Sequence, residues 1–369
     1  MNPWKSNLIL SEIPWSYYLH PCPKFYAEEL SLQGPTIWVD PPTRNPAKLR
    51  LFRPNPKLLV LRPWFFKRSA DNLGFDRPEV RLQVKVISSL FLKSPSSVWS
   101  ISTAYEHLLM DYSPEVSLFW SGDFFDPEGE FTTYENFDIL LCLTPVTFEG
   151  TPSKFTGKKV PFNMCCDLKL FQREEKQTPT SIVHALADRP KDAPVAGYVG
   201  TLSDRRIDYD LLSETAEKLP QVSFLLVGKD DGAQSTSERL DKVGRLPNVR
   251  IVMDLDYPDM PATIRSFDVC LIPYHTNDAN LGTCPTKFVE YCAVGKPIVS
   301  TQLPGIAKFP KLVGLAGSSD EFVRLIELQS QNRDETLFRQ QRSFALDSSP
   351  SRFLERFITT LQTNDVTNS

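Results

Sequence analysis

The chain has 369 residues, of which 41% are hydrophobic and 23% charged, and its formal net charge is −4. This length favours two domains over a single core. A mildly acidic chain lacks the basic footprint of nucleic-acid-binding proteins, so we expect no nucleic-acid partner. Apolar runs such as Leu58–Leu61 are far shorter than the roughly 20 residues of a membrane span, and the first residues do not resemble a signal peptide. We therefore expect a cytoplasmic protein.

Cysteine and histidine form no metal-ligand pattern. The seven cysteines are odd in number and include no C-x-x-C spacing, and the four histidines are scattered. Buried, reduced thiols are the simplest interpretation. We expect no metal site built from these residues and no cofactor of that kind.

Strands are predicted along the first half by short apolar runs rich in β-branched and aromatic residues. The runs are Leu8–Leu10, Thr36–Val39, Lys57–Leu61, Val98–Ile101, Val116–Trp120, Asp138–Leu143 and Lys159–Phe162. All six tryptophans lie within the first 120 residues, which indicates two domains of different character. We place the boundary in a polar, proline-bearing stretch, giving an N-terminal domain over residues 1–185.

The second half alternates strand and helix patterns. Its strand runs are Val195–Val199, Val222–Val227, Val249–Met253, Val269–Ile272, Pro297–Ser300 and Leu312–Leu315, and its helical patterns are Asp208–Lys218, Pro258–Phe267, Pro285–Val294 and Ser319–Ser330. This alternation predicts an α/β fold with one parallel sheet per domain, facing across a cleft. The second domain is predicted over residues 186–345. A helix and polar tail follow over 346–369, with the helix packing back on the first domain.

A glycine turn at Gly200-Thr201 follows the first strand of the second half. Glycine lets a ligand approach the backbone, and the exposed N–H groups suit an anion. Arg206 lies shortly afterwards and adds positive charge. Such turns and exposed arginines also occur in proteins that bind nothing there, so the motif alone does not decide between the two interpretations.

The block from Pro285 to Ser300 carries a stronger signal. Pro285 fits the first position of a helix and Gly295 fits the residue just past its end. Lys287 and Glu290, three residues apart, share a face. The helix N-terminus with Lys287 suits a diphosphate, and Glu290 suits the hydroxyl groups of a ribose. An ordinary surface ion pair on a well-capped helix is the alternative.

Five segments together resemble a known family. Gly197–Ser203, Leu225–Gly228, Leu246–Val249, Ser266–Tyr274 and Pro285–Ser300 occur in this order and spacing in GT-B glycosyltransferases. The chain is most similar to the "glycosyl transferases group 1" type, which includes enzymes of bacterial exopolysaccharide synthesis. The resemblance is clear over about residues 194–315 and fainter in the first half. It implies GT-B architecture, with two Rossmann-like domains that bind a nucleotide-sugar donor and an acceptor.

The resemblance also implies roles for single residues. Gly200 and Thr201 would lie beside the donor phosphates, Arg206 and Lys287 would neutralise them, and Glu290 would hold the ribose. Proteins of this fold generally need no metal, because cationic side chains and helix amides offset the charge of the leaving diphosphate. The implied activity is that of a metal-independent hexosyltransferase whose nucleotide-sugar is a co-substrate.

One position departs from the family pattern. Many retaining members have a glutamate where this chain has Gly282. Asp278 or Asn280 would then contact the hydroxyls of the donor sugar, or the reaction would be inverting, with Asp123 as the base that deprotonates the acceptor. Asp123 could equally cap a turn. A nucleotide-sugar-binding protein without turnover is the alternative function.

Aromatic residues of the first half suggest an acceptor side. The segments Trp15–His20 and Trp64–Arg68 follow predicted strands. They suit stacking on a glycan, lipid-linked or small-molecule acceptor, and the second suits peripheral docking on an anionic membrane at the inner face of the plasma membrane. Core packing is the alternative for each aromatic residue.

Overall fold

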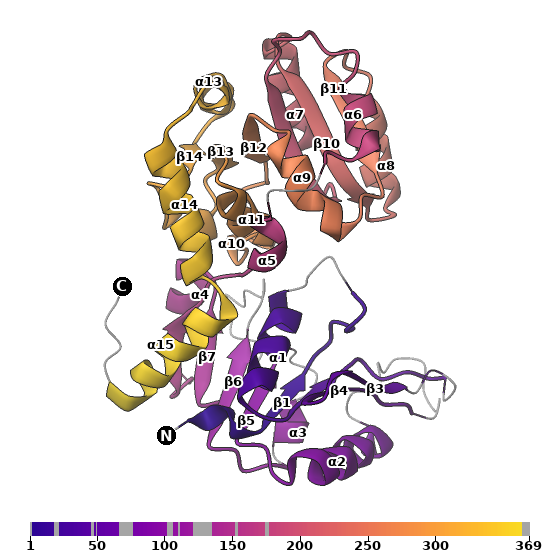
Figure 1. Ribbon diagram of the computed structural model, residues 1–369, viewed down its shortest axis with the longest axis vertical. Helices are drawn as coiled ribbons and strands as arrows, with labels where there is room; N and C mark the ends of the chain where they lie inside the picture. Colours follow the sequence, from indigo (N-terminus) through magenta and orange to yellow (C-terminus); the bar gives the residue numbers. More distant parts are fainter. Residues whose placement is uncertain are drawn as a thin grey trace. The chain divides into compact units, whose positions relative to one another are not determined.

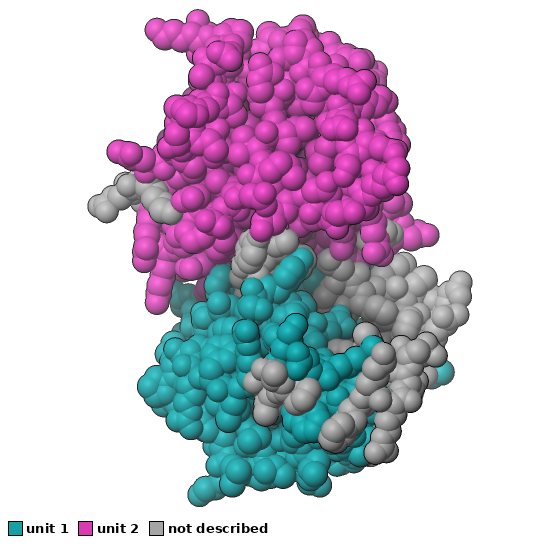
Figure 2. Space-filling view, turned by 90° about the vertical axis from the view of Figure 1, so that its right-hand side faces the viewer, with its two compact units in different colours: residues 1–162, 350–369 teal, residues 163–349 magenta. Residues whose placement is uncertain are grey.

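The computed structural model of the chain describes residues 2–17, 22–45, 48, 50–65, 77–101, 106–109, 111–120, 135–151, 154–173 and 177–363. The chain divides into two compact units, coloured separately in Figure 2. Unit 1 contains residues 1–162 and 350–369, and unit 2 contains residues 163–349.

Unit 1 is built on an eight-stranded sheet with the strand order β3-β4-β2-β1-β5-β6-β7-β8. Every pairing is parallel except that of β3 with β4, a hairpin at the edge that the sequence analysis did not predict. The elements are η1 (Pro3–Lys5), β1 (Asn7–Leu10), α1 (Cys22–Gln33), β2 (Thr36–Val39), β3 (Arg50–Asn55), β4 (Leu58–Arg62), α2 (Pro78–Leu92), β5 (Ser97–Ser100), α3 (Glu106–Leu109), β6 (Val116–Trp120), β7 (Ile139–Cys142), α4 (Pro145–Glu149), β8 (Lys158–Pro161) and α15 (Pro350–Thr363).

The two faces of this sheet bury different side chains, because alternate strand residues point to opposite faces. Leu8 and Leu10 of β1 join a core that includes Val80 and Val84 of α2. The other face holds an aromatic core, in which Tyr26 of α1 contacts rings from the strands and from α15. Trp4, Trp38, Trp99 and Trp120 are each at most 3% exposed. Core packing therefore accounts for these four tryptophans.

The aromatic segment after β1 is only partly open to solvent. Trp15 is 9% exposed and packs edge-on against Trp38, whereas Tyr17 is 40% exposed. Tyr18 and His20 lie outside the described residues, as do Phe66, Lys67 and Arg68. Among the described aromatic residues of this segment, Tyr17 is therefore the one exposed enough to contact an acceptor.

Unit 2 is built on a six-stranded parallel sheet with the order β11-β10-β9-β12-β13-β14, and helices lie on both of its faces (Figure 1). Its elements are α5 (Leu168–Phe171), α6 (Thr180–Ala185), β9 (Val195–Leu202), α7 (Tyr209–Lys218), β10 (Ser223–Asp230), α8 (Gln234–Val243), β11 (Val249–Met253), η4 (Tyr257–Asp259), α9 (Met260–Arg265), β12 (Val269–Ile272), α10 (Asp278–Leu281), α11 (Thr286–Val294), β13 (Ile298–Thr301), α12 (Pro304–Ala307), β14 (Gly314–Ala316), α13 (Ser319–Ser330) and α14 (Glu335–Asp347).

The unit boundaries differ from the predicted limits at residues 185 and 345. Residues 163–185 belong to unit 2 because α5 packs on α11 and α6 packs on β11. The polar composition of this stretch suggested a linker. Its apolar residues are nevertheless part of the core, since Ile182 is fully buried and Phe171 is 1% exposed. At the other end α15 belongs to unit 1, where Phe353 contacts Tyr26 and Phe357 contacts Trp4.

Candidate functional site

The sheet of unit 2 reverses its strand order between β9 and β12. From β9 the chain proceeds outward to β10 and β11, and then returns to β12 on the other side of β9. β9 and β12 pair at only two positions, Ala196 with Val269 and Gly197 with Cys270, although β9 continues to Leu202. Their carboxyl ends therefore diverge. In open parallel sheets this is the point at which ligands bind.

A tyrosine hydroxyl bridges the diverging strands. Tyr291 of α11 is completely buried, and its hydroxyl accepts the N–H of Val199 at 3.0 Å and donates to the carbonyl of Leu271 at 3.4 Å. These backbone groups belong to β9 and β12. Buried backbone groups need hydrogen-bond partners, and where the two strands no longer pair the Tyr291 hydroxyl is such a partner.

Two glycines face each other at the carboxyl ends of β9 and β10. Gly200 has φ +142° and pairs in register with Gly228, where an added Cβ would lie 1.7 Å from the Gly200 carbonyl oxygen. A Cβ on Gly200 would lie 3.0 Å from Cε of Lys287. Only glycine fits both positions, and the Lys287 side chain lies directly against the Gly200 backbone.

The ammonium of Lys287 is held by two tyrosines. It lies 4.9 Å from the ring centre of Tyr198 and 4.8 Å from that of Tyr274, and it donates a hydrogen bond to the Tyr274 hydroxyl. Cation–π contacts of this kind fix a lysine without neutralising it. The Tyr198 hydroxyl donates to the carbonyl of Thr201 at 2.8 Å, which also fixes the turn. The result is a positive charge beside open glycine backbone, a combination that suits an anion.

Glu290 lies on the same helix, one turn further along, and is 6% exposed. Burial raises the pKa of its carboxyl from an ordinary 4.5 to about 7, while the Lys287 ammonium and the Tyr257 hydroxyl act in the opposite direction. The Tyr257 hydroxyl is buried and lies close enough to the carboxylate to influence it, although the two do not form a hydrogen bond of regular geometry. The ring of Tyr257 packs on Phe171 with their centres 5.8 Å apart. Glu290 is thus a buried carboxylate with little compensation from its own chain.

Arg206 joins the two loops that follow β9 and β12. Its guanidinium donates to Asn280 Oδ1 at 3.0 Å and to the hydroxyl of Thr283. The Asn280 amide donates to the carbonyl of His275 at 2.9 Å, and the N–H of His275 donates to the carbonyl of Arg206 at 2.9 Å. Asn280 is completely buried, and its amide oxygen and amide nitrogen both hydrogen-bond residues of the two loops.

Among the remaining predicted residues, the described Asp278 does not join this cluster. Asp278 is exposed at the start of α10, and Gly282 is the residue at which α10 ends. Asp123 lies outside the described residues. Gly200, Thr201, Lys287 and Arg206 surround the strand ends, whereas Glu290 lies deeper along α11.

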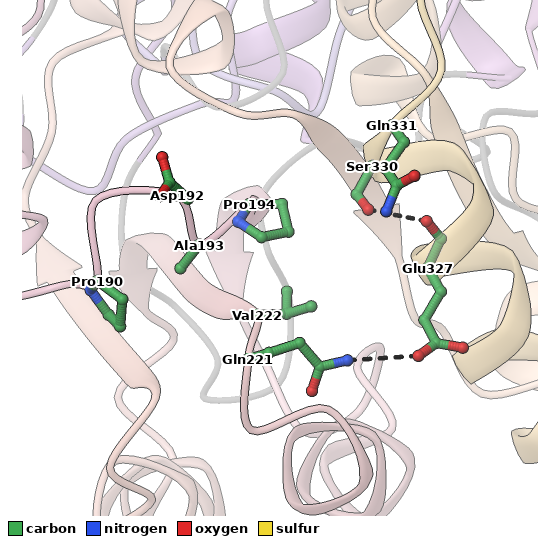
Figure 3. A pocket seen from close by; sticks show the side chains of 9 residues that line it. All are labelled: Pro190, Asp192, Ala193, Pro194, Gln221, Val222, Glu327, Ser330 and Gln331. Carbon is green, nitrogen blue, oxygen red and sulfur yellow. Dashed lines mark hydrogen bonds between the residues drawn. The ribbon is translucent and has the colours of Figure 1, made fainter.

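A cavity of about 460 Å³ lies elsewhere in unit 2. Pro194 and Val222, which line it, immediately precede β9 and β10, so the cavity adjoins the amino ends of these strands. Across it, Gln221 hydrogen-bonds Glu327 of α13 at 3.3 Å (Figure 3). Ligand sites of this fold lie at the opposite, carboxyl ends. We therefore assign the site to the residues around Lys287 rather than to the cavity.

The tyrosines of this site are not indicated by the sequence patterns. Tyr198, Tyr274 and Tyr291 lie in segments that were identified, but a sequence pattern does not show which hydroxyl reaches which strand. Tyr198 and Tyr274 each lie at the end of a predicted strand, next to the glycine turn or the loop before α11. Their position at two adjacent strand ends is the signal that could have found them.

Both units are Rossmann-like α/β domains, as in proteins of the GT-B fold. Residues 193–326 match the model of the family "Glycosyl transferases group 1".

Individual proteins are also similar to this chain. Over 188 residues the chain is 29% identical to the putative teichuronic acid biosynthesis glycosyltransferase TuaH of Bacillus subtilis, a match that covers 50% of this chain and 45% of TuaH. The chain thus spans about half the length of this curated relative. Among solved structures, the sucrose-phosphate synthase of Thermosynechococcus elongatus superposes with a TM-score of 0.71 at 14% identity, covering 98% of each chain. Anabaena HepE in complex with UDP and glucose gives 0.67 at 14% identity, covering 97% of this chain and 99% of HepE.

Proposed function

We propose that this protein transfers a hexose from a nucleotide-diphosphate sugar to a hydroxyl of an acceptor, in the synthesis of a surface polysaccharide or glycoconjugate. The observation that carries the proposal is the fixed ammonium of Lys287 against the Gly200 backbone, at the divergence of β9 and β12. The group 1 family match and the likeness to TuaH support this reaction class.

Each site residue has a role in this proposal. Lys287 and the backbone at Gly200 and Thr201 bind the diphosphate and stabilise the negative charge that develops on it as the sugar leaves. Glu290 accepts hydrogen bonds from the ribose hydroxyls. Arg206, held by Asn280 and Thr283, adds positive charge next to the same turn.

Metal independence is part of the proposal. Fixed cations can replace a divalent ion in stabilising a leaving diphosphate. Transfer that persists in excess EDTA would support this, and transfer that needs added Mg²⁺ or Mn²⁺ would contradict it.

The acceptor side of the proposal concerns unit 1. The acceptor is a glycan, a lipid-linked sugar or a small molecule, Asp123 is the base that deprotonates its hydroxyl, and Asp278 contacts the donor sugar. We place the protein in the cytoplasm at the inner face of the plasma membrane. Among the described residues no helix is both long and apolar enough to cross a bilayer.

Calorimetry with UDP and other nucleoside diphosphates tests the donor site. We expect Lys287→Ala to weaken binding about 30-fold, because a charged hydrogen bond contributes roughly 2 kcal/mol. Lys242→Ala is the matched control, since the Lys242 side chain is 67% exposed on α8. Equal affinity of the wild type and the Lys287 variant would remove the site assignment.

The absence of a glutamate at Gly282 favours a second candidate, a protein that binds nucleotide-sugars without turnover. Incubation of the purified protein with a panel of nucleotide-sugars separates the two. Release of nucleoside diphosphate by transfer or hydrolysis rejects the second candidate, and tight binding without release supports it.

A further inference from the structure

Helix α2 of unit 1 carries apolar residues on two faces. Its inner residues Val80 and Val84 are fully buried against the sheet. On its outer side Leu82, Val86 and Leu90 follow one another at intervals of four, and they are 61%, 46% and 79% exposed. Residues four apart lie on one helix face, so these three form a continuous stripe, here called the α2 stripe. A helix that covers a sheet needs only its inner apolar face.

Basic side chains flank the α2 stripe on both sides. Arg81 and Lys85 are exposed and form the adjacent row of the same helix. On the other side Arg53 of β3 lies 5.0 Å from the ring centre of Phe91, which places this strand next to the C-terminal half of α2. Leu51 of β3, 53% exposed, adds apolar surface to this side.

Acidic charge near the stripe does not cancel the basic charge. Arg81 makes two hydrogen bonds to the carboxylate of Asp111, and Lys85 lies 3.9 Å from the same carboxylate. One carboxylate therefore serves two cations, and its side chain is only 8% exposed. Arg53 and Lys93, at the end of the helix, add further exposed positive charge. Even with Glu79 in the first turn of α2, this face holds more basic than acidic side chains, whereas the chain as a whole has a net charge of −4.

We propose that the α2 stripe and its basic flanks are the docking surface for an anionic lipid bilayer. An apolar stripe bordered by lysine and arginine is the pattern of helices that lie in the plane of a membrane interface, where long cationic side chains reach the headgroups. A second copy of the chain is a poorer fit, because a two-fold contact through this face would bring two sets of cations together. This surface gives a structural basis for the membrane association within the proposed function, but it does not depend on glycosyl transfer.

Vesicle co-sedimentation tests the surface. We expect the full chain to bind vesicles of phosphatidylcholine with phosphatidylglycerol, and to remain in the supernatant with phosphatidylcholine alone. The variant Leu82→Ser/Val86→Ser/Leu90→Ser is expected to bind at least about tenfold more weakly, because the apolar area that enters the interface is lost. Arg53→Gln/Lys85→Gln is expected to weaken binding and to reduce its sensitivity to salt.

A matched control replaces three apolar residues of unit 2. Val183, Leu328 and Leu346 are 52%, 60% and 44% exposed, and the variant with serine at all three is expected to bind like the wild type. Equal binding of the α2 variant and this control would overturn the proposal. So would a wild-type chain that stays in the supernatant with both kinds of vesicle, or an α2 variant that loses self-association instead of lipid binding. UDP affinity, measured in parallel, should be unchanged in the α2 variant and reports separately on the donor site.

Discussion

Unit 1 buries the carboxylate of Asp40 and unit 2 buries that of Glu290, and the two differ in how many hydrogen bonds they accept from the chain. Asp40 follows β2 in unit 1 and is 1% exposed. It accepts hydrogen bonds from the backbone of Trp15, the indole of Trp38 and the guanidinium of Arg62, with the nearest Arg62 nitrogen at 2.6 Å. Glu290 in unit 2 is 6% exposed and has a raised pKa.

In the proposed function, Asp40 is a structural carboxylate and Glu290 is a binding carboxylate. Asp40 is saturated by its own chain, so its burial costs little and it ties together three segments of unit 1. Glu290 lacks such saturation, and its burial is therefore unfavourable until a ligand supplies donors. We infer that unit 1 uses its carboxylate for stability, and that unit 2 gives up stability to bind a ligand.

Breaking the saturated carboxylate should have the largest effect. Arg62→Met leaves Asp40 buried without its cation, and removal of one partner of a buried pair typically costs about 3–5 kcal/mol. We expect a clear fall in the Tm of unfolding, with UDP affinity unchanged because that site is in unit 2. Lys5→Met is the control, since Lys5 and Glu115 form an exposed pair that should contribute under about 1 kcal/mol. If the Arg62 variant is as stable as this control, Asp40 does not have the stabilising role that we assign to it.

The raised pKa of the Glu290 carboxyl should make the stability of the folded state depend on pH. Its folded pKa is raised to about 7, so the folded state holds the proton more tightly than the unfolded state does. Stability without ligand should therefore fall as pH rises from about 4.5 to 7, by about 3 kcal/mol from this group. Nucleotide affinity should rise over the same window, because ribose hydroxyls donate to the charged form.

Glu290→Gln separates the two effects. The variant should lose this fall in stability and be more stable than the wild type at pH 8, while binding UDP more weakly. Denaturant titrations and calorimetry across pH measure both quantities. Glu217→Gln, at an exposed position on α7, is the control. A Glu290 variant that is destabilised at pH 8 would contradict our account of this residue.

The smallest expected effect is at Tyr257. Its hydroxyl lowers the pKa of Glu290, so Tyr257→Phe should shift the pH midpoint of UDP binding slightly upward. Tyr112→Phe removes a hydroxyl that bonds Ser88 in unit 1 and should leave the midpoint unchanged. If UDP binds the wild type but the midpoint stays fixed in the Tyr257 variant, this tyrosine does not influence Glu290.

Much of the fold could be predicted from the sequence, for a physical reason. Strands of a parallel sheet are buried on both faces, so they appear as continuous apolar runs such as Val116–Trp120 and Val269–Ile272, and both are strands. The edge strand β3 was missed because its residues are exposed and its sequence, RLFRPN, shows no such run. The boundary at residue 185 was placed by polarity, whereas contacts of α5 and α6 decide the actual division.

The candidate site was only partly predictable. The block around Lys287 and Glu290 was identified because proline, glycine and charge mark a helix end in the sequence. The partners of these residues were not, because they come from distant segments. Arg206 and Asn280 were each expected to contact the donor, yet they bond to each other, 74 residues apart in the chain.

The hydroxyl of Tyr291 has a consequence for the kinetics of binding. Because it spans β9 and β12 from within α11, the gap between these strands is already open before any ligand arrives. In the proposed function, a nucleotide that binds unit 2 need not force the sheet apart, so we expect this site to be preorganised. Its association rate should then be limited by encounter with the ligand rather than by a rearrangement of the sheet.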